Sequence, residues 1–139
     1  MKNQNLITVC VNINTTIEKA WDCFTNPTHI THWYFASEDW CCPKAKNDLL
    51  VGGKFLTRME SKDGTMGFDF EGIYSTVELH KKIEYYLSDG RTVSILFEKE
   101  NNETKVTEIF VAENENPIEM QKGGWQAILN NFKNYVENN

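Results

Sequence analysis

Residues 54–74 read KFLTRMESKDGTMGFDFEGIY. Asp63-Gly64 is a tight-turn signal, and large apolar side chains alternate with polar ones on both sides of it, Met59 before the turn and Phe68 and Phe70 after it. A period of two is typical of a strand with one buried face. The stretch therefore predicts a β-hairpin whose aromatic side chains share one face.

The same pattern extends from the hairpin to residue 112. Further turn signals stand at Asp89-Gly90 and Asn101-Asn102, and no helical pattern separates the strands between them. Closely spaced strands of this kind predict an antiparallel meander. Residues 6–14 also alternate, so we expect about six or seven strands in all.

Two short helices are expected after the first strand. Residues 15–18, TTIE, have the form of a capping box with Thr15 as the N-cap, and this predicts a helix to about Thr25. A second short helix is predicted over residues 29–33. Residues 34–48 are predicted to form a loop.

A long amphipathic helix is expected after Pro117, because its apolar residues recur at helical spacing. Gly123 and Gly124 are costly inside a helix, so they predict either a close approach to the sheet or the start of the helix. One helix cannot cover the whole face of a sheet that twists and curls. The prediction is one α+β domain over residues 1–139, with a space between helix and sheet that suits an apolar ligand.

Composition narrows the classes of function. The 139 residues include 14 Lys and Arg against 20 Asp and Glu, a net charge of −6, which argues against binding to nucleic acid or to an anionic membrane surface. Met1–Asn5 leads directly into a strand pattern, so no signal peptide is expected. No stretch approaches 18 apolar residues. We expect a cytoplasmic protein with reduced cysteines, as a monomer or a weak homodimer.

The hairpin leaves open which face lines the space. The charged alternative is Arg58, Glu60, Asp69 and Glu71, which could support acid–base catalysis in a cyclase-type or hydrolase-type enzyme. The apolar alternative is favoured, because burying each large apolar side chain stabilises the fold by about 1.5–3 kcal/mol, whereas burying four charges costs more than their pairing returns.

Histidines and cysteines offer two weaker hypotheses. His29 and His32, near Cys41 and Cys42 in sequence, could bind zinc or form a thiol–imidazole nucleophile. The alternative is surface histidines and loosely packed thiols. Since the spacing matches no known ligand pattern and no orienting group is evident, we expect neither a metal nor a cofactor.

Several runs together resemble one family over essentially the whole chain. They resemble the bacterial branch of the activator of heat-shock protein 90 ATPase homologue-like (AHSA-type) family, in the START-like (SRPBCC) superfamily. The runs are Ile17-Glu18-Lys19-Ala20-Trp21, Asn47-Asp48-Leu49, Gly52-Gly53-Lys54-Phe55, Arg58-Met59-Glu60, Lys62-Asp63-Gly64, Gly67-Phe68-Asp69-Phe70-Glu71-Gly72-Ile73-Tyr74, Asp89-Gly90-Arg91 and Gly124-Trp125-Gln126-Ala127-Ile128-Leu129.

This resemblance implies a helix-grip fold, which lipid-transfer domains and polyketide cyclases share. Thr15-Thr16 departs from the family's usual Ala-Pro, which only exchanges one kind of helix start for another. The chain is too short to include the eukaryotic activator's separate chaperone-binding domain as well.

The leading prediction is a binding protein for a hydrophobic or aromatic small molecule, rather than an enzyme. A module that contacts a chaperone or another protein is the alternative. Glu108 is the one acid expected near the pocket. The predicted ligand-binding residues are Trp33, Trp40, Phe55, Met59, Phe68, Phe70, Tyr74, Tyr85, Ile95, Glu108, Trp125 and Leu129.

Overall fold

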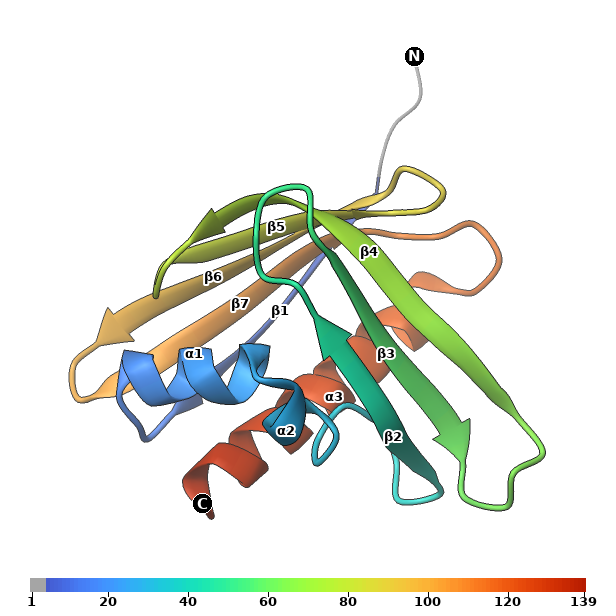
Figure 1. Cartoon of the computed structure of the whole chain (residues 1–139), viewed down its shortest axis with the longest axis horizontal. Helices are drawn as coiled ribbons and strands as arrows, with labels where there is room; N and C mark the ends of the chain where they lie inside the picture. Colours follow the sequence, from blue (N-terminus) through green and yellow to red (C-terminus); the bar gives the residue numbers. More distant parts are fainter. Residues whose placement is uncertain (1–4) are drawn as a thin grey trace.

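The chain forms one antiparallel sheet and three helices in a computed structural model that describes residues 5–139 (Figure 1). The 7 strands lie in the order β1-β7-β6-β5-β4-β3-β2. The strands are β1 (Leu6–Ile13), β2 (Trp40–Asn47), β3 (Lys54–Ser61), β4 (Gly67–Glu78), β5 (Lys82–Leu87), β6 (Thr92–Glu100) and β7 (Glu103–Val111). The helices are α1 (Ile17–Thr25), α2 (Pro27–Ile30) and α3 (Ile118–Glu137).

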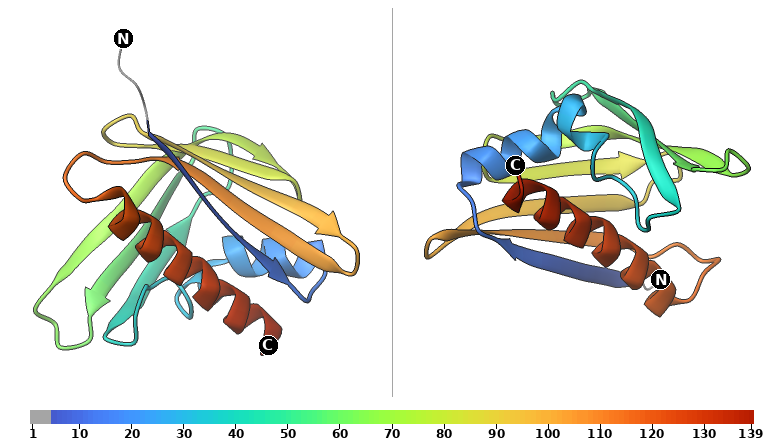
Figure 2. Two further views of the ribbon diagram at one scale, coloured as in Figure 1. Left: turned by 180° about the vertical axis from the view of Figure 1, so that it is seen from behind. Right: turned by 90° about the horizontal axis from the view of Figure 1, so that it is seen from below.

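The sheet is curled, and α3 lies along its open side (Figure 2). The helix packs against β1 and, less extensively, against α1. Its buried residues Leu129, Phe132 and Val136 all belong to its C-terminal half, apart from Gln121 near the start. This arrangement confirms the predicted α+β helix-grip fold.

The hairpin signals correspond to turns in the structure. Gly64, Gly90 and Asn101 have positive φ angles of 77°, 90° and 58°, a conformation that glycine and asparagine adopt at low cost. The turn between β4 and β5 has His80 at φ 62° instead. Because histidine is a weaker turn signal, the sequence pattern gave no boundary at that point.

Two local predictions near the N-terminal helices were wrong. The N-cap of α1 is Thr16 rather than Thr15, and its hydroxyl accepts from the backbone N–H of Lys19 at 3.2 Å. The second helix begins at Pro27 rather than residue 29, because the Asn26 side chain caps it by accepting from the Thr28 N–H at 3.0 Å.

The predicted loop over residues 34–48 contains a strand, β2. Its pairing with β3 shifts register between Cys41 and Lys44, around Pro43. Because a bulge breaks the alternation of apolar and polar side chains, the pattern that predicts a strand is lost there.

Gly123 and Gly124 differ from both predictions made for them. The helix starts at Ile118, so both glycines lie inside α3. A Cβ atom added at either position would meet nothing within 4 Å, so neither glycine allows a close approach to the sheet. The part of α3 that carries these two glycines therefore has unfilled space beside it.

Within residues 5–139, no helix is long and apolar enough to cross a membrane. Residues 1–4, on which the expectation of no signal peptide partly depends, lie outside the described residues.

Candidate functional site

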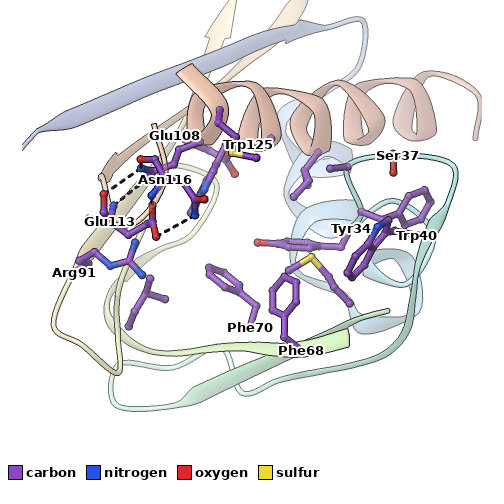
Figure 3. Close-up of a pocket in the computed structure, with 18 residues that line it drawn as sticks. Tyr34, Ser37, Trp40, Phe68, Phe70, Arg91, Glu108, Glu113, Asn116 and Trp125 are labelled. Carbon is purple, nitrogen blue, oxygen red and sulfur yellow. Dashed lines mark hydrogen bonds between the residues drawn. The ribbon is translucent and has the colours of Figure 1, made fainter. Parts of the chain in front are cut away.

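A cavity of about 530 Å³ lies between the N-terminal half of α3, strands β3 and β4, and the segment between α2 and β2 (Figure 3). It occupies the part of the concave face where α3 carries its two glycines. The lining residues are Tyr34, Phe35, Ala36, Ser37, Trp40, Met59, Phe68, Phe70, Leu87, Arg91, Glu108, Glu113, Asn116, Met120, Gln121, Gly124, Trp125 and Ile128.

The wall of the cavity that β3 and β4 form is apolar. In the antiparallel register Met59 pairs with Phe68 and Thr57 with Phe70, so these four side chains share the concave face. Phe68 is 49% exposed near the open edge, whereas Phe70 packs inward. The rings of Phe70 and Trp125 are nearly perpendicular, with planes at 83° and centroids 5.9 Å apart.

The charged residues of the hairpin lie on the opposite face. Arg58 pairs with Glu60 at 3.0 Å and with Asp69 at 3.3 Å, and all three side chains are about one-third exposed or more. The structure therefore selects the apolar alternative, and the acid–base arrangement proposed for the charged face does not line the cavity. The register is the reason, since neighbouring side chains of a strand point to opposite faces, and only one of the two sets can line the cavity.

The loop wall is held to α3 by Asn131. Its side-chain amide donates to the carbonyl oxygens of Phe35 at 3.0 Å and Trp33 at 3.4 Å. This places Tyr34 and Trp40 on the side of the cavity opposite the polar rim (Figure 3).

The helix wall is formed around Trp125. The indole stacks on Phe110 of β7, with ring centroids 3.8 Å apart and planes 14° from parallel. Gly124, beside it, adds no side chain to the cavity. Ile128, one turn further along, also lines the space.

A polar network closes the rim near the start of α3. The Gln121 side chain accepts from the Glu113 N–H at 2.9 Å and donates to the Asn116 carbonyl oxygen at 2.8 Å. Arg91, also at the rim, pairs with Asp89 at 2.7 Å. These rim groups therefore have partners within the protein.

Glu108 is the acidic residue that enters the interior. It lies in β7 with 6% of its surface exposed and faces the cavity. Burial raises the pKa of its carboxyl to about 8. Burial is the largest cause that raises the pKa values of Tyr34 and Tyr85 well above the ordinary range. The Glu108 charge is the next cause for Tyr34, whereas for Tyr85 it follows the interaction with Tyr34.

The predicted site residues fall into three places. Six line the cavity, namely Trp40, Met59, Phe68, Phe70, Glu108 and Trp125. Four line an adjoining void of about 30 Å³, namely Phe55, Tyr74, Tyr85 and Ile95. Trp33 and Leu129, each 1% exposed, line neither space and belong to the core.

The sequence reasoning missed several lining residues. Ile128 could have been found, since it lies one helical turn from Trp125. Tyr34 lies in the segment predicted to form a loop, so no periodic pattern assigned its side chain to a face. Leu87, Arg91 and Met120 carried no signal, because only the curl of the sheet and the position of α3 bring them to the cavity.

The histidine–cysteine hypotheses find no support in the geometry. His29 is engaged on both ring nitrogens, by the Tyr135 hydroxyl at 2.6 Å and by Asp22 at 3.3 Å. Burial raises the pKa of Cys42 to about 11, which is opposite to the shift that a nucleophilic thiol needs. Among residues 5–139, no group of three metal-ligating side chains is assembled.

The sequence matches one protein family over most of its length. A family model described as "Activator of Hsp90 ATPase homolog 1-like protein" matches residues 14–137. No curated protein matches the chain.

Solved structures resemble the chain over nearly its whole length. The solution structure of an AHSA1-like protein from Aeromonas hydrophila is 39% identical, with a TM-score of 0.87 over 95% of this chain and 93% of that one. A protein from Cytophaga hutchinsonii is 48% identical, with a TM-score of 0.82 over 95% of this chain and 92% of that one. A Chromobacterium violaceum protein at 20% identity shares the fold, with a TM-score of 0.84 over 96% and 97%.

Proposed function

The chain belongs to the Activator of Hsp90 ATPase homolog 1-like family, and we propose that it binds a hydrophobic or aromatic small molecule in the cavity between α3 and the sheet. The observation that carries this proposal is the cavity of about 530 Å³ with aromatic and aliphatic walls. Small-molecule sites are typically concave, mostly apolar and of about 300–1,000 Å³.

The aromatic side chains support the same proposal. Trp40, Phe68, Phe70 and Trp125 come from three different elements, β2, β4 and α3, and converge on one space. Leaving so much apolar surface around an open volume gives up packing that a filled core would have. A bound apolar molecule would restore those contacts, which is the physical reason for it to bind.

The two helix glycines provide a matched test. Gly124 lines the cavity, whereas the neighbouring Gly123 is exposed and does not. A Cβ atom added at either position meets no atom within 4 Å. The probe is the neutral, apolar dye N-phenyl-1-naphthylamine, whose fluorescence rises in an apolar site.

Wild type should bind the dye, and Gly124→Leu should bind it roughly 5- to 150-fold more weakly, since a side chain that overfills a site costs about 1–3 kcal/mol. Gly123→Leu should keep the wild-type affinity. Absence of dye binding to wild type, or equal loss in the two variants, would contradict the proposal.

A further inference from the structure

Glu108 has no partner that explains its burial. Within residues 5–139, no lysine, arginine or histidine nitrogen forms an ion pair with it. Burial is the one cause of its pKa shift, with no contribution from a hydrogen bond. The carboxyl is not sealed in the core, because no fully buried side-chain oxygen of the described residues lacks a hydrogen-bond partner. It borders the cavity, where a carboxylate taken out of water without a cation is costly.

The position on the sheet makes this acid unusual. Glu108 pairs in register with Val9 of β1 and Ile95 of β6, and Val106 and Phe110 are its neighbours on the same face of β7. All four of these side chains are buried and apolar. A leucine or glutamine would suit the packing at lower cost, so the carboxyl needs an explanation outside the packing of the sheet.

The interior around Glu108 is largely aromatic, and among residues 5–139 no cation is paired with its carboxyl. The groups that face it are the phenols of Tyr34, from the segment after α2, and Tyr85, from β5; both have pKa values raised in part by its charge. Trp125 and Phe70 add aromatic rings, whose faces carry negative charge density. Arg91 lines the same cavity but is paired with Asp89, and Glu113 belongs to the rim network.

We propose that the ligand is an apolar molecule carrying one protonated amine, which pairs with the Glu108 carboxylate inside the aromatic part of the cavity. This inference rests on the proposed function, because it names the class of molecule that the same cavity binds. An ammonium group would supply the missing charge partner and would also be attracted to the ring faces. The net charge of −6 favours the approach of a cation over that of an anion.

Binding of the amine should release one proton from Glu108. Around neutral pH the carboxyl is mostly protonated, since burial raises its pKa to about 8. When the ammonium ion pairs with it, the O–H bond of the acid breaks, its proton passes to water or buffer, and the ion pair remains, with no covalent bond between ligand and protein. Amine affinity should therefore rise with pH between 6 and 8 by up to about tenfold per unit.

The test compares three probes of one shape by isothermal titration calorimetry between pH 6 and 8.5. They are 1-naphthylmethylamine, which is cationic, 1-naphthylmethanol, which is neutral, and 1-naphthoate, which is anionic. Wild type should bind the amine more tightly than the alcohol at pH 8.5, by roughly 10- to 100-fold for a charge-assisted contact. Proton release should be measured from the dependence of the binding enthalpy on the buffer.

Glu108→Gln is the decisive variant, because it keeps the shape and removes the charge. It should bind the amine and the alcohol within about twofold of each other and lose the proton release. Glu98→Gln, which removes an acid at an exposed position on β6 outside the cavity, is the matched control and should keep the wild-type preference.

The outcomes separate this inference from the function on which it rests. If the alcohol binds as well as the amine and Glu108→Gln changes neither, the amine inference fails while the cavity still binds apolar molecules. If the alcohol binds better at low pH and weakens above pH 8, Glu108 acts as a neutral hydrogen-bond donor, and the inference is overturned. If neither these probes nor the neutral dye binds, both proposals fail.

Discussion

At the scale of the residue, Glu108 links the chemistry of the cavity to the stability of the fold. Its folded-state pKa of about 8 lies above the ordinary value of 4.5. The folded protein therefore holds this proton more tightly than the unfolded chain does between those two values. The stability associated with the protonated acid is fully present below about pH 4.5 and is lost as pH rises towards and through 8.

Glu108→Gln should remove this dependence. The free energy of unfolding of wild type relative to the variant should fall by up to about 1.4 kcal/mol per pH unit between pH 5 and 8, and should level off above pH 8.5. Urea unfolding of both proteins across that range measures the difference. The free energy of unfolding of Glu98→Gln, a change at an exposed position on β6, should have the same pH dependence as that of wild type. A difference between wild type and Glu108→Gln that does not change with pH would contradict the raised pKa of Glu108.

Trp33 shows how a residue can resemble a ligand contact in sequence and belong to the core. Its indole N–H donates to the Cys23 carbonyl oxygen at 2.9 Å. The residue four positions after Cys23 is Pro27, which has no N–H to offer that carbonyl. The indole thus satisfies a helix-end group that the backbone cannot.

Trp33→Phe should destabilise the protein by about 1–3 kcal/mol, because it leaves that carbonyl unpaired, yet it should leave dye affinity unchanged. Phe68→Ala should do the reverse, with a stability loss below about 1 kcal/mol at a half-exposed site and weaker dye binding. Thermal unfolding together with dye titration checks both variants. Weaker dye binding by Trp33→Phe at a temperature where it is folded would contradict the core assignment.

At the scale of the element, the start of α1 separates two adjacent threonines. The Thr16 hydroxyl caps the helix, whereas the Thr15 carbonyl, a backbone group, accepts from the Thr104 hydroxyl at 2.9 Å. Replacement by alanine therefore removes the contact of Thr16, which is made by its hydroxyl, and keeps that of Thr15, which is made by its backbone.

Thr16→Ala should lower the free energy of unfolding by about 1 kcal/mol, and Thr15→Ala by less than about 0.5 kcal/mol. Chemical denaturation of the two variants in parallel provides the measurement. Equal losses would mean that Thr16 is not the dominant cap.

At the scale of the whole molecule, the two halves of α3 have different surroundings. The C-terminal half is buried through Leu129, Phe132 and Val136, whereas the N-terminal half borders the cavity and contains both glycines. Few packed contacts and two glycines lower the cost of local opening.

Backbone amides of residues 123–126 should therefore exchange with deuterium faster than those of residues 130–133. Saturating N-phenyl-1-naphthylamine should slow exchange in the first group more than in the second. Native-state hydrogen exchange with residue resolution tests this, and equal protection in the free protein would show that the cavity does not weaken the helix.

The sequence by itself determined the helix-grip architecture and the apolar character of one hairpin face. Period-two alternation, glycine and asparagine turns and the apolar stripe after Pro117 are local signals, since each depends on backbone geometry within a few residues. Even there, the bulge around Pro43 concealed β2, because a break in alternation removes the local signal.

Only the tertiary structure decided which apolar residues line the space and which fill the core. Trp33 and Trp40 are alike in sequence terms, yet one is 1% exposed in the core and the other lines the cavity. Their difference depends on how far the sheet curls and where α3 crosses it, which are set by packing between segments far apart in the chain. That Glu108 forms no ion pair with the described residues has the same origin. It depends on all the side chains packed around the carboxyl, and these come from separate parts of the chain.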